Sequence, residues 1–277
     1  MMRHRALHAN PVVRAIFRKV PSRREHPMAT EDKFSKGTPC EICPLRPLEI
    51  FRPFKHEELA FVANFKIGER SVESGGTILS EGERSEHLFT VLSGWGFRYK
   101  VLKDGRRQIL NYVMPGDMVG LQGTLMGEMQ HSIEALSPVT LCVFKRTGLE
   151  QLYRQHPDLA YDITWIAARE ERILDENLLS IGRRSALERA AYLLAFLYQR
   201  AATLQVFRGG RNAIPISQQH VADTLGLSIV HTNKTLRKLA GRDFIRWADR
   251  GCEVRDIRGL LRLAGWEGFS EPKRPLI

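Results

Sequence analysis

The most informative part of the chain is residues 214–239, which read Ile214-Pro-Ile-Ser-Gln-Gln-His-Val-Ala-Asp-Thr-Leu-Gly-Leu-Ser-Ile-Val-His-Thr-Asn-Lys-Thr-Leu-Arg-Lys-Leu239. Ser217 is a favourable N-cap, and the residues after it place apolar side chains on one face of a short helix. Gly226 then allows a sharp turn, and Ser228 can cap a second helix. The stretch therefore predicts two helices joined by a tight turn.

The outer face of the second predicted helix is polar and basic, whereas Leu236 and Leu239 can pack inward. Thr232 and Thr235 also face the first helix, where an aliphatic residue is more usual. Asparagine can pair with adenine edges, and lysine with guanine or phosphate. The pattern predicts a helix-turn-helix that binds DNA. The candidate DNA-contacting residues are Ser217, Gln218, Gln219, Ser228, Val230, His231, Asn233, Lys234 and Arg237. Of these, His231, Asn233 and Lys234 are the predicted base readers.

The same two helices also occur as a plain helical hairpin in many enzymes, so the flanking sequence matters. Phe244-Ile-Arg-Trp247, a polar turn ending at Gly251, and Cys252-Glu-Val-Arg255 follow directly. Two short β-prone runs around a turn are typical of a β-hairpin. A helix-turn-helix followed by a hairpin predicts a winged helix.

Charge is unevenly distributed along the 277 residues, whose formal net charge is +11. Residues 183–262 hold fifteen Lys and Arg against six acidic residues, and residues 1–27 hold seven against one, whereas residues 28–182 are net acidic. A basic C-terminal domain is the electrostatic pattern of a protein that binds the phosphate backbone.

The chain contains no run of eighteen apolar residues, so no membrane-spanning segment is expected. Residues 1–27 lack the apolar core of a signal peptide. They are interpreted as a basic arm that touches DNA, as a disordered extension, or as sequence upstream of a working start at Met28. Four cysteines do not make a disulfide framework, which favours a reducing cytoplasm.

The middle of the chain consists of short β-prone runs separated by turn residues. Asp104-Gly105 is the strongest hairpin signal among these turns. Regular short strands with glycine-rich corners predict a sandwich or jelly roll. The predicted strands are 77–80, 88–92, 96–102, 106–113, 132–135 and 139–144.

A long helix is predicted from Pro157 to Arg183. Its apolar stripe contains Ile163, Ile166, Ile173, Leu174 and Ile181, interrupted on the same side by Glu170 and Asn177. The stripe can pack on its own β-domain. Alternatively it can pair with a second copy, since an embedded asparagine fixes register in paired helices and twofold DNA sites call for twofold proteins.

The order of β-roll, long helix and winged helix-turn-helix resembles the CRP/FNR superfamily of bacterial transcription regulators. The resemblance runs from about Cys40 to Leu263. It implies an α+β fold with a basic extension (1–39), a cyclic-nucleotide-binding-like jelly roll (40–156), a dimerisation helix (157–182), a DNA-binding domain (183–265) and a tail (266–277). The motifs that carry it are Gly82-Glu, Leu92-Ser-Gly94, Asp104-Gly-Arg-Arg-Gln108, Pro115-Gly-Asp117 and Arg183-Arg-Ser-Ala-Leu-Glu-Arg189.

Members of this family that bind cyclic AMP offer a glutamate to the ribose and an arginine to the cyclic phosphate. Here Gly120 is followed by Leu121-Gln122, and residues 126–133 contain no arginine. A buried phosphate without a cationic partner is costly. The sequence therefore disfavours cyclic AMP as a ligand.

The FNR branch holds an iron-sulfur cluster between N-terminal cysteines and one cysteine of the roll. The resemblance implies Cys40, Cys43 and Cys142 as the matching ligands, but the third N-terminal cysteine is absent and its place falls near Glu49. A cluster or metal, a reversible disulfide of Cys40 and Cys43, and no cofactor all remain open. For Cys142, the role of a buried small hydrophobe is also open.

The function predicted from the sequence is a homodimeric, sequence-specific transcription regulator that responds to oxygen or redox state. The resemblance adds RNA polymerase as a partner. One alternative is a CRP-like regulator without a cofactor, constitutive or responsive to another ligand. A cupin-type metalloenzyme is the rival class, but His87 and His131 lie far apart and no His-x-His pair is present.

Overall fold

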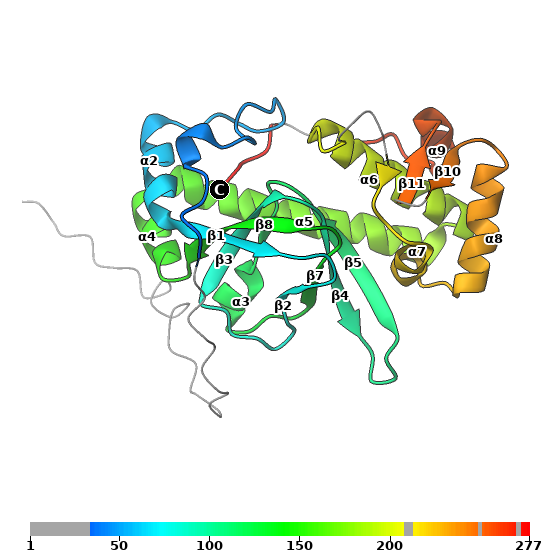
Figure 1. Cartoon of the computed structure of the whole chain (residues 1–277), viewed down its shortest axis with the longest axis horizontal. Helices are drawn as coiled ribbons and strands as arrows, with labels where there is room; N and C mark the ends of the chain where they lie inside the picture. Colours follow the sequence, from blue (N-terminus) through cyan, green and yellow to red (C-terminus); the bar gives the residue numbers. More distant parts are fainter. Residues whose placement is uncertain (1–33, 208–212, 249–250, 270–272) are drawn as a thin grey trace, which may run out of the picture.

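Figure 1 shows the fold of the chain in a computed structural model. The structure describes residues 34–207, 213–248, 251–269 and 273–277. The basic segment 1–27, for which the sequence gives three interpretations, lies outside the described residues.

Two four-stranded antiparallel sheets form the N-terminal roll, as predicted. One sheet has the order β1-β8-β3-β6 and the other β2-β7-β4-β5. Alternating residues of both sheets bury the apolar interior, which includes Phe89, Val91 and Leu141. The strands are β1 (Lys66–Val72), β2 (Thr77–Leu79), β3 (His87–Ser93), β4 (Gly96–Val101), β5 (Arg107–Val113), β6 (Met118–Val119), β7 (Ser132–Ala135) and β8 (Val139–Lys145).

The predicted hairpin at Asp104-Gly105 joins β4 to β5. The Asp104 carboxylate accepts a hydrogen bond from the backbone N–H of Arg106 at 3.1 Å. Gly105 has φ +86°, a conformation that favours glycine. The turn therefore has the residues that its backbone requires.

Short helices flank the roll, and α5 (Pro157–Arg183) runs behind its strands toward the C-terminal domain (Figure 1). The long helix has the predicted bounds, with proline in its first turn, where no hydrogen bond is lost. The shorter elements are η1 (Cys40–Ile42), α2 (His56–Phe65), α3 (Leu121–Met126) and α4 (Gly148–Gln155).

The predicted stripe of α5 packs largely on its own chain. Ile163 and Ile173 are 1% and 3% exposed in the core. The Asn177 side-chain amide donates to the Leu110 carbonyl of β5 at 2.9 Å, so this asparagine is bound within its own chain. The large apolar side chains that α5 leaves exposed are Tyr161, Leu178 and Leu179. For its buried residues, the stripe packs on its own β-domain and not on a second copy.

The C-terminal domain begins at a capping box, in which Ser185 and Glu188 each bond the other's backbone N–H. It comprises α6 (Ala186–Thr203), β9 (Ala213–Ile214), α7 (Gln218–Leu225), α8 (Ile229–Ala240), β10 (Ile245–Ala248), β11 (Gly251–Val254) and α9 (Ile257–Ala264). β10, β11 and β9 form a three-stranded sheet, in which β10 and β11 are the predicted wing.

No helix among the described residues is long and apolar enough to cross a membrane.

Candidate DNA-binding surface and the sites behind it

The two helices α7 and α8 form the predicted helix-turn-helix. The Ser217 hydroxyl accepts from the His220 backbone N–H at 3.1 Å, and the Ser228 hydroxyl accepts from that of His231 at 3.2 Å. Gly226 ends α7 with φ +64°. Each predicted cap and the predicted turn are therefore in place.

The two faces of α8 differ in burial. Thr232, Thr235, Leu236 and Leu239 are at most 4% exposed and face the domain core. On the opposite side Val230 is 76% exposed. The exposed side chains of that face that carry polar or charged groups are His231, Lys234, Arg237 and Lys238. This outer face has the length, charge and polarity of a helix that enters a major groove.

Asn233 and Lys238 differ from what the sequence predicts. Asn233 is half-buried, and its side-chain oxygen is buried with no hydrogen-bond partner among the described residues. Lys238 was missed, yet it lines a shallow depression together with Val230, His231 and Lys234. Lys238 lies one helical turn after Lys234, so its position in the helical period was the available signal.

The predicted phosphate contacts at the start of α7 are mostly exposed. Ser217 and Gln219 are exposed and Gln218 is half-buried. The Gln219 amide donates to the Asp223 carboxylate at 2.7 Å, which orients it along the helix. The helix N-terminus itself carries partial positive charge, so its surroundings suit a phosphate.

The DNA-binding domain docks on the roll through α7 and β5. Arg107 of β5 forms an ion pair with Asp223 at 2.8 Å, and the Gln108 amide donates to the Thr224 carbonyl at 2.9 Å. The buried Tyr112 hydroxyl lies 2.8 Å from the Thr224 hydroxyl. Burial and the charge of Arg107 lower the pKa of His220, whose ring lies 5.2 Å from that of Phe97. The orientation of α7 is thus tied to the roll.

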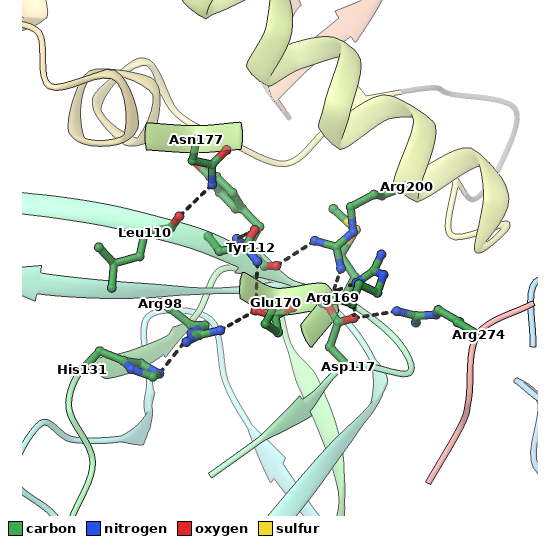
Figure 2. A network of polar contacts seen from close by, with 12 residues as sticks. Arg98, Leu110, Tyr112, Asp117, His131, Arg169, Glu170, Asn177, Arg200 and Arg274 are labelled. Atoms are coloured by element: carbon green, nitrogen blue, oxygen red, sulfur yellow. Dashed lines mark hydrogen bonds and ion pairs between the residues drawn. The ribbon is translucent and has the colours of Figure 1, made fainter. Parts of the chain in front are cut away.

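A polar network fills the space between the roll and α5 (Figure 2). Arg98 of β4 donates to the His131 ring at 3.1 Å and pairs with Glu170 of α5. The Asn111 amide also donates to Glu170 at 3.2 Å. Burial and the charges of Arg98 and Lys100 lower the pKa of His131 to about 3, so this ring is neutral at pH 7.

The network contains an arginine that the sequence of residues 126–133 does not predict. Although residues 126–133 contain no arginine, Arg98 reaches His131 from a neighbouring strand. Its charge is already matched by Glu170, so the guanidinium is not free for a phosphate.

A second polar cluster surrounds Asp117 of the Pro-Gly-Asp turn (Figure 2). Its carboxylate pairs with Arg200 of α6, with Arg274 at 2.8 Å and with Arg169 of α5 at 3.9 Å. Burial raises the pKa of Asp117, but the three guanidinium charges outweigh it and hold the pKa below its usual range. One carboxylate thus joins the roll, α5, α6 and the end of the chain.

The three candidate cysteine ligands gather around Lys66. Cys40 begins η1 and Cys43 directly follows it; both are half-buried, and Cys142 of β8 is buried. Burial raises the pKa of Cys142 to about 12 against the opposing charge of Lys66, and burial also raises that of Cys40. The Lys66 ammonium donates to Glu69 and to the Thr38 carbonyl, both at 2.7 Å.

These residues, as they lie, do not fit an iron-sulfur cluster. Within the described ranges no group of three or more His, Cys, Asp or Glu side chains is placed to hold a metal ion. The Lys66 ammonium also lies among these candidate donors, next to Cys40 and Cys142. His87 packs against Phe34 in a T-shaped contact, whereas His131 accepts a hydrogen bond from Arg98, so the two histidines do not converge either.

Comparison with known proteins agrees with this architecture. Residues 69–156 match the cyclic nucleotide-binding domain family, and residues 188–263 match the Crp-like helix-turn-helix domain family. The chain is 32% identical over 228 residues to the nitrogen fixation regulation protein FixK of Bradyrhizobium diazoefficiens, covering 81% of this chain and 93% of FixK. The chain belongs to the CRP/FNR family.

Other CRP/FNR relatives support the assignment. The transcriptional activator protein FnrL of Cereibacter sphaeroides is 26% identical over 82% of this chain and 92% of its own length. The solved structure of FixK2 from Bradyrhizobium japonicum is 28% identical with a TM-score of 0.63, covering 70% of this chain and 96% of that one. This CRP/FNR protein is a DNA-binding transcription regulator, in a family of regulators and not of enzymes.

Proposed function

We propose that the protein binds twofold-symmetric DNA sites as a homodimer and regulates transcription in the cytoplasm together with RNA polymerase. The main support for this proposal is the outer face of α8. Its exposed side chains follow the N-cap of the helix and include Val230, His231, Lys234 and Arg237. We assign base contacts to His231, Lys234 and the exposed side of Asn233. Phosphate contacts fall to Ser217, Gln218, Gln219, Ser228 and Arg237.

In vitro selection from random duplexes tests this function. The protein should recover a motif with two related half-sites. Lys234→Ala should cost on the order of 1–3 kcal/mol on the recovered duplex if it reads a base edge, and less on random DNA. Lys145→Ala is the matched control, because Lys145 is an exposed lysine of the roll. Recovery of no motif, or equal weakening by both variants, contradicts the proposal.

The dimer surface in this proposal is the exposed side of α5, within the proposed dimerisation helix 157–182. Leu178 and Tyr161 are 71% and 69% exposed, although the opposite side of the helix is buried in its own chain. Exposed apolar side chains on a domain-linking helix suit a partner helix better than solvent. A second copy of α5 supplies the same surface by twofold symmetry.

We propose a redox signal carried by the thiols of Cys40 and Cys43, and not by cyclic AMP. The two residues are separated by one turn of η1, with the Cys43 backbone N–H bonded to the Cys40 carbonyl at 3.3 Å. A peroxide would accept two electrons and two protons as the two thiols close to a disulfide, so that hydrogen peroxide leaves two water molecules and an alkyl hydroperoxide leaves one alcohol and one water. Because Arg98 is already paired with Glu170, it is not available to bind the phosphate of cyclic AMP.

Peroxide titration of the purified protein tests the signal. DNA affinity should change with peroxide and return with dithiothreitol, and the Cys40→Ser/Cys43→Ser variant should show neither change. Cys252→Ser serves as the control, because Cys252 is buried in the winged helix. Iron and sulfide in anaerobically purified protein, or an unchanged peroxide response in the double variant, would contradict a thiol switch. Tight binding of cyclic AMP by calorimetry would contradict its exclusion.

A further inference from the structure

The last described residues of the chain, 273–277, lie in the roll and not beside the winged helix that precedes them (Figure 1). After α9, Trp266 packs on Tyr192 of α6 with ring centroids 5.2 Å apart, and Phe269 packs on Phe196 at the same distance. The residues that follow α9 therefore pack along α6 before the chain reaches the roll. We call residues 273–277 the tail segment.

The tail segment is buried as deeply as a core strand. Arg274, Leu276 and Ile277 are 3%, 6% and 4% exposed. The Arg274 backbone N–H donates to the Ile50 carbonyl at 2.8 Å, and the Arg52 N–H donates to the Arg274 carbonyl at 2.9 Å. These two bonds form a parallel bridge to the segment that leads into α2.

The Arg274 side chain reaches the Pro-Gly-Asp turn. Its guanidinium donates to Asp117 at 2.8 Å and to the Pro115 carbonyl at 2.7 Å, and it lies 4.7 Å from the centre of the Phe51 ring. A Cβ atom on Gly116 would lie 2.5 Å from the Arg274 guanidinium and 2.4 Å from the Phe51 ring. The absence of a side chain at residue 116 is therefore what makes room for Arg274.

The DNA-binding domain consequently meets the roll at two separate places. At one, Asp223 of α7 is paired with Arg107 of β5. At the other, Arg200 of α6 and Arg274 of the tail segment share the Asp117 carboxylate. One attachment leaves a domain free to rotate about it, whereas two fix its orientation.

We propose that Arg274 is a positioning residue, which sets the orientation of the winged helix relative to the roll by anchoring the tail segment on Asp117. The inference rests on the proposed function, since orientation matters when two α8 helices of a dimer must meet two half-sites at one spacing. Loss of the Arg274–Asp117 contact lowers the effective concentration of the second protomer's α8 at its half-site. The dimer then binds DNA with a wider range of distances between the two half-sites.

The test uses the full-length protein and the duplex recovered by selection, with its half-site spacing lengthened or shortened by one base pair. Arg274→Ala releases the tail segment from Asp117 but leaves the carboxylate paired with Arg200 and Arg169, so only the tail segment's part of this attachment is lost and the buried carboxylate keeps its other charge partners. Lys273→Ala is the matched control, because this neighbouring lysine is exposed. Arg274→Lys keeps a cation at the same place.

Arg274→Ala should bind a single half-site as tightly as the wild type, while its preference for the selected spacing over the altered ones falls about tenfold. Lys273→Ala should keep the full preference, and Arg274→Lys should restore part of it. Unchanged spacing preference in Arg274→Ala would overturn the proposal, and so would an equal loss on half-site and full-site DNA. If the wild type itself shows no spacing preference, the proposed dimeric function fails instead.

Discussion

Asp117→Asn should cause a large loss of stability. The carboxylate is 5% exposed and faces three guanidinium groups, each at most 8% exposed. It also accepts a hydrogen bond from the Met114 backbone N–H at 2.8 Å. An asparagine keeps the shape but removes the negative charge with which the buried Arg200 and Arg274 are paired. Removing one partner of a buried ion pair costs about 3–5 kcal/mol, so the free energy of unfolding should fall by at least that range.

Urea denaturation at pH 7, followed by tryptophan fluorescence, measures this loss. Trp95 is 6% exposed in the roll core and reports its unfolding. Asp158→Asn is the control, because Asp158 forms an exposed ion pair with Lys55 and its removal should leave the midpoint unchanged. A loss below about 1 kcal/mol, the size of a surface ion pair, would refute the view that Asp117 neutralises the cluster.

The remaining predictions concern pH, thiols and assembly. The pKa of His131 is lowered from 6.5 to about 3 in the fold, so below pH 6.5 the unfolded chain binds a proton that the folded chain does not. The free energy of unfolding is therefore unaffected by this group above pH 6.5 and falls by up to about 1.4 kcal/mol per pH unit between 6.5 and about 3. In His131→Gln the urea midpoint should depend less on pH over that range. Iodoacetamide at pH 8 should label Cys43 in the native protein but Cys142 only after unfolding, since burial raises the pKa of Cys142 to about 12; native labelling of Cys142, detected by mass spectrometry, would contradict this. Leu178→Lys should convert the dimer to monomer in sedimentation velocity, whereas Gln151→Lys on the exposed side of α4 should not; a dimeric Leu178→Lys protein would place the interface elsewhere.

Most of the fold was predictable because its signals are local. Caps such as Ser217 and Ser228, and turn residues such as Gly105 and Gly226, act over a few positions, and the structure confirms each of them. The bounds of α5 were equally clear from its hydrophobic period. The surface that packs against α5 could not be predicted, because an apolar stripe indicates that a helix face is buried but not what covers it.

The polar clusters could not be predicted, since they join residues far apart in the sequence. Arg98 meets His131 and Glu170 only when β4, the segment before β7 and α5 come together. The anchor of Arg274 on Asp117 spans still more of the chain. No periodicity or motif predicts such pairs. The absence of arginine in residues 126–133 therefore did not reveal that Arg98 enters the same region from β4.

The most direct test of the central claim is the salt dependence of DNA affinity, measured side by side on the selected duplex and on random DNA. A basic winged helix that reads base edges should bind the selected duplex at least about a thousandfold more tightly at physiological salt. Both affinities should fall steeply as salt rises, because counterions are released from several phosphates. Equal affinity for the two duplexes, or binding that stays flat between low and physiological salt, would contradict a sequence-specific DNA-binding function for α8.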